Sequence, residues 1–375
     1  MIEPSSFFDL LSTQGIQFFT GVPDSLLKDI CAYITETCSS EQHVIAANEG
    51  GAVGLAIGHH LASGDIPLVY LQNSGLGNIV NPILSLADKE VYSIPLVILI
   101  GWRGQPGVSD EPQHVKQGRI TEALLNELEI PFATIPSNET GAKDAVESMV
   151  QIARNESRPV ALLIPKGTFS GYQMSEEAKT SFPMNREIAI KELVSQLSSK
   201  DIIVATTGKA SRELFESREA LNQGHQQDFL TVGGMGHASQ IALGIALNKK
   251  ERTVYCFDGD GAAIMHLGSL PIIAAAKATN LVHIVINNGA HDSVGGQPTV
   301  GFDIDFCAIA TASGYESACS VETKEELKIA ITEAATGNAT YLIEVKVNKG
   351  ARKELGRPTT TPVENKMAFM PFVES

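Results

Sequence analysis

Short apolar runs alternate with longer, partly polar segments along the first half of the chain. The apolar runs are rich in β-branched residues, which favours strands, and they lie at residues 16–19, 43–47, 67–71, 94–101, 131–135 and 159–164. The segments between them have helical patterns and lie at residues 24–38, 49–63, 76–88, 117–128 and 140–155. Near-continuous apolar strands separated by helices predict a parallel sheet that is covered on both faces.

The same alternation begins again after an interruption. Residues 171–185 combine Gly, Pro and charged residues, so we interpret them as a linker between two domains. The strands expected after this linker lie at residues 201–206, 228–232, 253–258, 281–287, 315–319 and 340–347. The pattern predicts an α/β fold with two doubly wound parallel-sheet domains, at residues 1–170 and 186–349, which share an architecture without a residue-level repeat. Residues 350–375 form a polar, Pro-rich tail, which we expect to run over the surface or to reach a site.

The length and the charge narrow the possible functions. A chain of 375 residues exceeds what one hydrophobic core usually covers, which agrees with two domains. The net charge of −15 argues against a nucleic acid or an anionic membrane surface as a partner, because most of the protein surface would repel either. An anionic substrate would therefore need a local cluster of cationic side chains, a metal ion or helix N-termini.

We expect a cytoplasmic protein. The five cysteines include no C-x-x-C pair, so disulfides and a structural zinc site are not expected, which suits a reducing compartment. The N-terminal residues lack the basic and long apolar regions of a signal peptide. The longest apolar run, residues 94–100, is far shorter than the ~20 residues that a membrane helix needs.

Two polar motifs follow consecutive expected strands in the second half. Gly259–Gly261 reads Gly-Asp-Gly, and Asn287–Ala290 reads Asn-Asn-Gly-Ala. Ligands of open α/β sheets bind beyond the carboxyl ends of the strands, where these motifs are expected to be neighbours. Asp260, the Asn288 side chain and the Ala290 carbonyl can supply three oxygens to Mg²⁺, and a diphosphate can supply two more. A Gly-Asp-Gly alone is more often only a turn, so only the two motifs together indicate a cofactor site.

The two motifs together resemble the cofactor signature of thiamine-diphosphate (ThDP) dependent decarboxylases. The resemblance extends to Ala46–Gly58, AANEGGAVGLAIG, in which Glu49 matches the family's catalytic glutamate. It implies that Glu49 hydrogen-bonds the aminopyrimidine ring of ThDP and so favours the tautomer that activates the cofactor. The alternative is that Glu49 only interacts favourably with the N-terminus of its helix.

A third segment, Val232–Leu247, reads as a strand, a Gly-rich turn and a helix. By the same resemblance Met235 is the large apolar residue that keeps the cofactor bent, although a Met packed in the core at a turn is the alternative. The residues implied to bind the cofactor are Glu49, Gly234, Met235, Gly259, Asp260, Gly261 and Asn288. The fold implied is that of two ThDP-binding domains, one for the pyrimidine and one for the diphosphate, without a large middle domain.

Within this superfamily the chain is most similar to the phosphonopyruvate decarboxylase family. The segments that carry this similarity are Thr20–Lys28, Asn73–Asn78, Ser109–Gly118, Thr206–Leu214, Asn287–Thr299 and Leu355–Thr360. The family implies ThDP- and Mg²⁺-dependent decarboxylation of 3-phosphonopyruvate to phosphonoacetaldehyde and CO₂, in phosphonate biosynthesis. It also implies a homo-oligomer of at least two chains, because the pyrimidine half of one subunit faces the diphosphate half of another.

The resemblance also suggests groups that deliver a proton after CO₂ has left. Asp24 and His114 match active-site positions of related decarboxylases, and His291 follows the metal motif directly. The chain departs from the longer decarboxylases, because it has a single His at position 114 instead of an adjacent pair and lacks a Glu after the Asn-Asn motif. As alternatives, Asp24 is the N-cap of a helix that begins at Ser25, and His114 is a surface loop residue.

An anionic head group on the substrate requires cations. The candidates for binding it are Lys209, Arg212, Arg352 and Arg357, although single basic residues in loops are usually only solvated. The nearest alternative function is sulfopyruvate decarboxylase, and a more distant one is a non-catalytic ThDP-fold binding subunit. The combination of Glu49, Asp260 and Asn288 argues against the latter, because a binding protein needs no carboxylate that activates the cofactor. A nucleotide-binding oxidoreductase is disfavoured, because no G-x-G-x-x-G opens a helix after the first strand.

Overall fold

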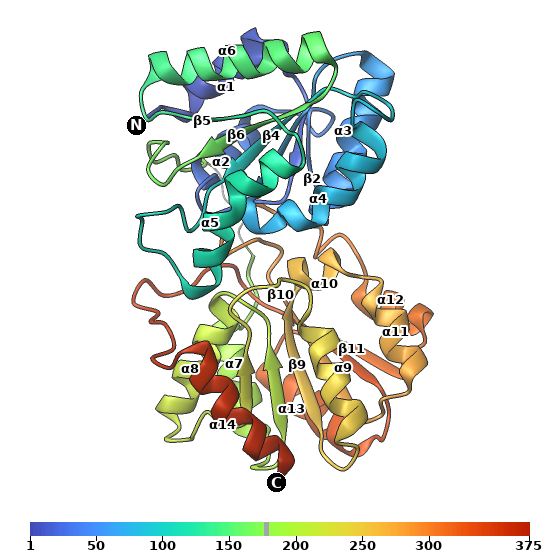
Figure 1. The fold of residues 1–375 in the computed structure, drawn as a ribbon. Coiled ribbons are helices and arrows are strands. Elements are labelled where there is room, and N and C mark those ends of the chain that lie inside the picture. Colours follow the sequence, from blue (N-terminus) through green and yellow to red (C-terminus); the bar gives the residue numbers. More distant parts are fainter. Residues whose placement is uncertain (176–179) are drawn as a thin grey trace. The chain divides into compact units, whose positions relative to one another are not determined.

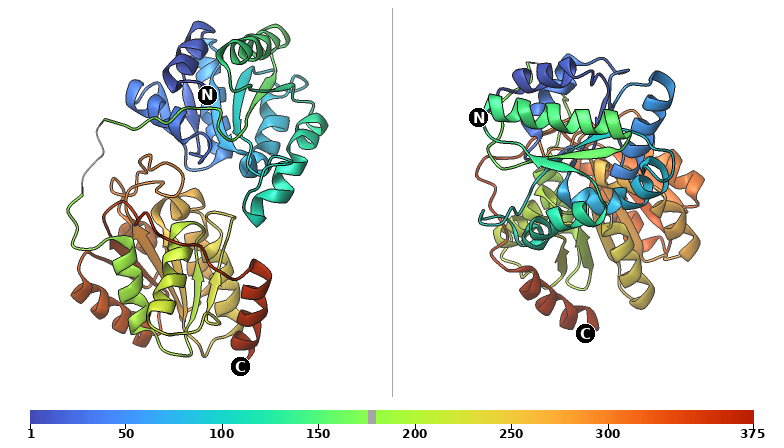
Figure 2. Two further views of the ribbon diagram at one scale, coloured as in Figure 1. Left: turned by 90° about the vertical axis from the view of Figure 1, so that its left-hand side faces the viewer. Right: turned by 45° about the horizontal axis from the view of Figure 1, so that its top comes forward.

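The computed structural model describes residues 1–175 and 180–375 of the chain. It contains two compact units, Met1–Glu177 (unit 1) and Ala178–Ser375 (unit 2). Each unit is an open parallel sheet with helices on both faces (Figures 1 and 2). Residues 176–179 of the predicted linker lie outside the described residues.

Unit 1 has six parallel strands in the order β2-β1-β3-β4-β6-β5. The strands are β1 (Phe19–Gly21), β2 (His43–Ile45), β3 (Leu68–Gln72), β4 (Leu96–Gly101), β5 (Phe132–Thr134) and β6 (Pro159–Ile164). The helices are α1 (Pro4–Thr13), α2 (Lys28–Thr37), α3 (Glu49–Ser63), α4 (Leu76–Pro82), α5 (Pro112–Glu127) and α6 (Glu139–Glu156). A 3₁₀ turn, η1 (Asn73–Gly75), precedes α4, and a π-helical turn, η2 (Ile83–Ala87), follows it.

The central strands of unit 1 are buried on both faces. In β4, Val97 belongs to the apolar cluster formed with α1, α2 and α6, whereas Leu96 and Ile98 belong to the cluster formed with α3, α4 and α5. All three side chains are fully buried. Because successive side chains of a strand point to opposite faces, a strand between two helix layers must be apolar at every position. This is why the sequence shows continuous apolar runs.

Unit 2 has six parallel strands in the order β11-β12-β10-β9-β7-β8. The strands are β7 (Ile202–Ala205), β8 (Asp228–Leu230), β9 (Val254–Gly259), β10 (Leu281–Asn287), β11 (Ser317–Val321) and β12 (Tyr341–Lys346). The helices are α7 (Arg186–Gln196), α8 (Lys209–Ala220), α9 (Ala238–Asn248), α10 (Asp260–Met265), α11 (Ser269–Ala276), α12 (Phe306–Ser313), α13 (Lys324–Thr336) and α14 (Pro362–Glu374). Counted along each unit, both sheets have the strand order 2-1-3-4-6-5, so the predicted shared architecture is confirmed.

The strand order determines where each unit can hold a ligand. In each sheet the first strand lies between the second and the third, so the connections leave it in opposite directions. The carboxyl ends of β1 and β3 in unit 1, and of β7 and β9 in unit 2, therefore flank a topological switch point, where open α/β sheets bind ligands.

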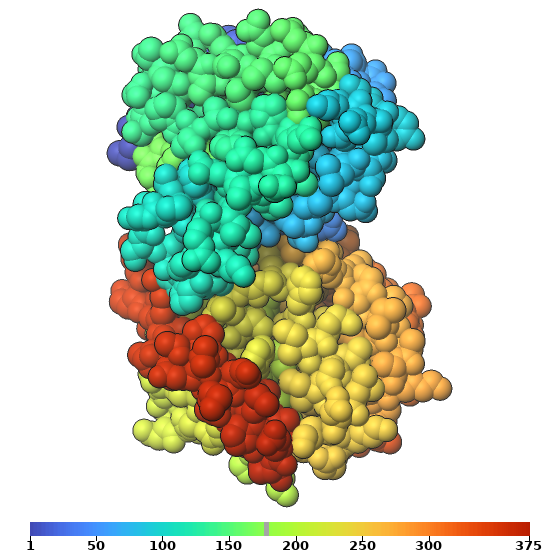
Figure 3. Space-filling view, in the orientation of Figure 1, coloured from blue at the N-terminus to red at the C-terminus, as the bar shows by residue number. Residues whose placement is uncertain are grey.

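The C-terminal tail was expected to run over the surface or to reach a site, and its helical end was not predicted. It ends in α14, which lies on the surface of unit 2 (Figure 3). Thr361 and Glu364 form a capping box and Pro362 occupies the first helical turn, where its missing N–H costs nothing. The Asn365 side chain accepts a hydrogen bond from the N–H of Leu230 at 3.1 Å and so pairs with the edge strand β8. The tail is therefore an integral part of unit 2.

Three further differences from the expected elements concern helices. The N-terminal helix α1 was not predicted, and α5 begins at Pro112, earlier than expected. Helix α2 begins at Lys28, because residues 25–27 form a turn. Among the described residues, no helix combines the length and the apolar character needed to cross a membrane.

Candidate cofactor-binding and active site

Asp260 lies at the switch point of unit 2. It is the first residue of α10, directly after β9, and its side chain is buried. The neighbouring strand β10 brings Asn288 next to it, and the Asn288 N–H donates to Asp260 Oδ1 at 3.4 Å. The hydroxyl of Thr299 donates to Asp260 Oδ2. A Cβ at Gly301 would lie 2.7 Å from the same Oδ2 atom, so the missing side chain leaves room for the carboxylate.

The environment of Asp260 suits a cation. Burial raises the pKa of this carboxyl to about 6, although the hydroxyl of Thr299 and nearby N–H groups lower it. A divalent ion would supply the positive charge that favours the ionised form. The carboxylate of Asp260, the carboxamide oxygen of Asn288 and the carbonyl of Ala290 form an all-oxygen donor set, which is the type that Mg²⁺ prefers. The residues present therefore fit this metal.

The two asparagines of the second motif have different surroundings. The Asn287 side chain donates to the carbonyl of Gly301 at 2.6 Å and to Glu344 at 2.7 Å, and it is fully buried. Its bonds hold the end of β10 to neighbouring segments. The Asn288 side chain only accepts the N–H of Ala290, at 3.1 Å, among the bonds described.

The turn that contains Met235 packs against the helix that begins with Asp260. Gly234 and Gly236 have positive φ angles of 66° and 83°. A Cβ at Gly236 would lie 3.0 Å from the carbonyl of Ala262 in α10, so this close approach requires glycine. Met235 is half-buried between the two glycines. The structure thus brings the predicted Gly234–Met235 segment and the Gly259–Gly261 motif together.

Glu49 lies at the N-terminus of α3 in unit 1, and its side chain is only 6% exposed. The side chain of Asn78 donates to Glu49 Oε2 at 2.7 Å. A Cβ at Gly75 would lie 2.4 Å from Oε1, so this glycine lets the chain pass directly over the carboxylate. A carboxylate that only favours the helix dipole requires neither burial nor a donating side chain. Its surroundings therefore favour the functional interpretation of Glu49.

Asp24 lies at the switch point of unit 1. Its side chain is fully buried, and it accepts hydrogen bonds from Gln72 Nε2 at 2.5 Å and from the N–H of Leu26 at 2.8 Å. A Cβ at Gly101 would lie 2.1 Å from Asp24 Oδ2. The alternative that Asp24 caps a helix from Ser25 is wrong, because α2 begins three residues later.

His114 is buried in the first turn of α5, so the alternative of a surface loop residue is also wrong. Burial lowers the pKa of its imidazole, and the positive charge of Arg103 lowers it further. Arg103 forms a bidentate ion pair with Asp110, in which Nε lies 2.8 Å from Oδ2 and Nη2 lies 2.5 Å from Oδ1. Its Nη1 atom donates to the hydroxyl of Ser25 at 2.7 Å. Arg103 and Asp110 were missed in the sequence analysis, although Arg103 follows an expected strand closely.

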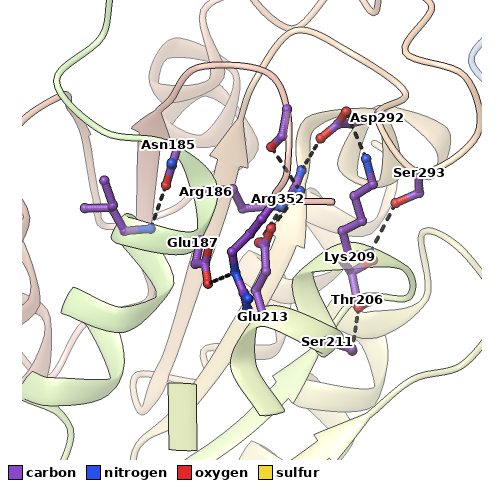
Figure 4. Close-up of polar contacts among 12 residues, drawn as sticks. Asn185, Arg186, Glu187, Thr206, Lys209, Ser211, Glu213, Asp292, Ser293 and Arg352 are labelled. Carbon is purple, nitrogen blue, oxygen red and sulfur yellow. Dashed lines mark hydrogen bonds and ion pairs between the residues drawn. The ribbon is translucent and has the colours of Figure 1, made fainter. Parts of the chain in front are cut away.

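His291 lies next to the Gly-Asp-Gly motif of unit 2, and Lys209 contacts the segment that follows the Asn-Asn motif. A Cβ at Gly261 would lie 3.0 Å from the His291 ring, and burial lowers the pKa of this imidazole to about 4. Lys209 is the first residue of α8, which follows β7. Its Nζ lies 3.2 Å from Asp292 Oδ1 (Figure 4).

Comparison with known proteins gives the same two halves. Residues 5–125 match the family described as Thiamine pyrophosphate enzyme, N-terminal TPP binding domain, and residues 206–345 match Thiamine pyrophosphate enzyme, C-terminal TPP binding domain. Phosphonopyruvate decarboxylase from Streptomyces viridochromogenes is 33% identical, with 100% of this chain and 95% of that protein covered. The same enzyme from Streptomyces hygroscopicus is 32% identical, with 99% and 94% covered. The chain belongs to the phosphonopyruvate decarboxylase family.

This membership confirms the fold class and the family that the motifs indicated. It excludes the nucleotide-binding oxidoreductase, because both halves match thiamine pyrophosphate binding domains. Sulfopyruvate decarboxylase from Methanosarcina acetivorans is also similar, at 29% identity over 84% of this chain and 84% of that protein. The similar proteins therefore include decarboxylases named for each of the two candidate substrates, phosphonopyruvate and sulfopyruvate.

Two arginines that were expected to bind substrate, Arg212 and Arg352, form hydrogen bonds and ion pairs within unit 2. Arg212 donates to the carbonyls of Leu355 and Gly356, each at 2.6 Å. Arg352 is paired with Glu187 at 2.7 Å and with Glu216. These bonds attach the tail to α7 and α8. Arg357 is an exposed residue of the tail. The substrate-binding role of all three stays a prediction.

Proposed function

We propose that this protein is a ThDP- and Mg²⁺-dependent decarboxylase of 3-phosphonopyruvate, which yields phosphonoacetaldehyde and CO₂. One observation carries the proposal. Each unit buries a carboxylate at a helix N-terminus and leaves space for it with a glycine, Glu49 with Gly75 and Asp260 with Gly301. Buried carboxylates are costly unless they bind a partner, so both positions suit functional groups.

In this proposal unit 2 holds the metal and the diphosphate. Asp260, Asn288 and the carbonyl of Ala290 would hold Mg²⁺, and the ion would supply positive charge that favours the binding of a diphosphate. Gly259 and Gly261 permit the close approach of the phosphates. The turn with Gly234 and Met235, which packs against α10, contributes the apolar support for the cofactor.

Glu49 acts on the other end of the cofactor. Its carboxyl group would exchange a proton with the aminopyrimidine ring when ThDP is bound, and the hydrogen bond from Asn78 keeps this carboxyl group in place. When bound, ThDP supplies the nucleophilic carbon and the electron sink that decarboxylation requires. The protein's further task is to deliver one proton to the substrate carbon that loses CO₂. Asp24, His114 and His291 are the proposed donors.

The substrate head group is an anion, and the surface of a protein with net charge −15 opposes it. We assign its binding to Lys209, Arg212, Arg352 and Arg357. Lys209 is the strongest of the four, because it begins a helix at the switch point and a quarter of its side chain is exposed. A sulfonate offers the same tetrahedral oxygens with less charge, so sulfopyruvate is the second candidate substrate, supported by the similarity to the Methanosarcina enzyme.

The proposed protein acts as a homo-oligomer of at least two chains in the cytoplasm. Glu49 and Asp260 belong to different units, and the family resemblance suggests that the halves of one site come from different subunits. The alternative of a non-catalytic ThDP-binding subunit predicts cofactor binding without turnover.

A substrate panel tests the function. The purified protein is given ThDP and Mg²⁺ with phosphonopyruvate, sulfopyruvate, pyruvate or phenylpyruvate, and CO₂ release is measured. We expect phosphonopyruvate to give the highest kcat/KM. A preference for sulfopyruvate would reassign the substrate. Retention of ThDP with no CO₂ from any of the four would instead favour the binding subunit.

A further inference from the structure

The segment 289–298 follows the proposed metal ligand Asn288 and folds back on itself. Ala290 and Pro298 form an antiparallel bridge that joins its ends. The N–H of Asp292 donates to the carbonyl of Ala290 at 2.9 Å. A carbonyl oxygen has two lone pairs, so this bond orients the Ala290 carbonyl and still leaves a position for a metal ion. The backbone of Asp292 is thus attached directly to a proposed metal ligand.

The side chain of Asp292 is held between two cations. Arg186 Nη1 lies 2.8 Å from Oδ2 and Lys209 Nζ lies 3.2 Å from Oδ1, so each oxygen has its own partner (Figure 4). The Asp292 and Arg186 side chains are 9% and 8% exposed. Burial raises the pKa of Asp292, but the two cations outweigh it and the net shift is downward. Each oxygen of the Asp292 carboxylate therefore has its own cationic partner.

Arg186 cannot follow a movement of Asp292 freely. Its Nε and Nη2 atoms also bind both oxygens of Glu213, at 2.7 and 2.9 Å, and Glu213 is 1% exposed. Arg186 begins α7, while Lys209 and Glu213 belong to α8. Two helices thus present a fixed pair of cations to the loop, and the four charges of this network balance.

A second contact ties the same loop to the start of α8. The N–H of Lys209 donates to Ser293 Oγ at 3.2 Å. The preceding residue, Gly208, has φ +91°, and a Cβ there would lie 2.6 Å from Ser293 Oγ. The loop therefore contacts α8 through two successive residues, Asp292 and Ser293.

We propose that Asp292 is a positioning residue, whose carboxylate is clamped by Arg186 and Lys209 so that Asn288 and the Ala290 carbonyl present their oxygens to the metal. The proposal rests on the proposed binding of ThDP and Mg²⁺ in unit 2. It also gives Lys209 a role that does not depend on the substrate.

The test is Asp292→Asn, which keeps the shape of the side chain and removes its charge. The Arg186–Glu213 pair remains intact, so the fold retains a compensated buried arginine. Removal of Arg186 would instead leave the buried carboxylate of Glu213 without the cation that it pairs with, and is a poorer test. ThDP binding is measured by calorimetry over a series of Mg²⁺ concentrations, without substrate. We expect the Mg²⁺ concentration for half-maximal ThDP binding to rise roughly 10–100-fold, as when groups that orient metal ligands are replaced.

Three further variants complete the test. Asp292→Glu keeps the charge and should recover part of the Mg²⁺ affinity. Asp303→Asn changes an exposed carboxylate in a nearby stretch of the chain and should bind as the wild type does. Lys209→Met removes the more exposed cation of the clamp and should raise the Mg²⁺ requirement several-fold. Melting temperatures without ThDP and Mg²⁺ separate these effects from loss of the fold.

The outcomes are distinct. If the folded Asp292→Asn protein needs the same Mg²⁺ concentration for ThDP binding as the wild type does, the clamp is overturned. If Asp260→Asn loses ThDP binding and Asp292→Asn does not, the proposed function still stands. Failure of the wild type to bind ThDP would overturn the proposed function itself. If Asp292→Asn does not fold, Lys209→Met decides: a raised Mg²⁺ requirement supports the clamp, and an unchanged one overturns it.

Discussion

Replacement of Glu49 by Gln is the most direct test of the proposed chemistry. The change keeps the size of the side chain and removes its ability to exchange a proton. The amide oxygen of a glutamine can still accept the hydrogen bond that Asn78 donates to Oε2 at 2.7 Å. The opposite edge of the group packs against Gly75, where a neutral NH₂ fits as well as an oxygen does. The local structure should therefore survive.

The expected effects on stability and on rate differ in size. Hydrogen bonds to charged groups contribute ~1.5–3 kcal/mol to stability, and those between neutral groups contribute ~0.5–1.5 kcal/mol. The substitution should therefore lower the free energy of unfolding by about 1 kcal/mol. General acid–base catalysis contributes ~10²–10⁴-fold to rates. At ~1.4 kcal/mol for each factor of ten, this is a rise of about 3–6 kcal/mol in the activation free energy.

The assay measures kcat from CO₂ release and measures ThDP binding by calorimetry at saturating Mg²⁺. Glu139→Gln is a matched control: Glu139 also begins a helix after a capping Asn, at Asn138, but it is exposed. We expect Glu49→Gln to bind ThDP, to keep its fold and to lose at least ~100-fold in kcat. Turnover of Glu49→Gln within a factor of about three of the Glu139→Gln control would refute the assignment of Glu49.

Three other predictions concern single residues. Gly75→Ala would bring a methyl group to 2.4 Å from Glu49 Oε1 and so displace the carboxylate. We expect kcat to fall ~100-fold, whereas calorimetry should still show Mg²⁺-dependent ThDP binding. Asp260→Asn should abolish the rise in melting temperature that ThDP and Mg²⁺ together give the wild type. Burial lowers the pKa of His43 to about 4, so between pH 6.5 and pH 4 the unfolded chain binds a proton that the folded chain does not, and stability falls on acidification. Urea titrations at pH 7 and pH 4 measure how far the free energy of unfolding falls on acidification. In His43→Phe this fall should be about 2–3 kcal/mol smaller than in the wild type, and an equal fall in both proteins would contradict the prediction.

Most strands could be predicted from the sequence, because a strand between two helix layers is apolar at every position. The predicted strand at residues 159–164 agrees with β6 at both ends, whereas the first strand was expected about three residues too early. Helix α14 was missed because its N-terminal sequence is polar and contains Pro362. It is stabilised by contacts such as that of Asn365 with Leu230, which is 135 residues away in sequence. Contacts over such distances leave no local periodic signal.

The candidate cofactor residues were named as candidates from the sequence, since they lie shortly after strands and combine Gly with Asp, Asn or Glu in a characteristic order. The residues that hold them in place were not. Asn78, which binds Glu49, and Asp292, which binds Arg186 and Lys209, read from the sequence as ordinary polar loop or helix residues. Their roles depend on which side chains meet in space.

The sequence alone determined the alternation of strands and helices, the two-domain division and the chemistry available at the strand ends, because these depend on side-chain pattern and type within short stretches. Only the tertiary structure decided the strand order and which charged groups meet. It pairs Arg352 with Glu187 and Glu216, and Lys209 with Asp292, in contacts that span 83 residues or more. The physical reason is that an ion pair depends on distance and burial, and both arise only when remote segments pack together.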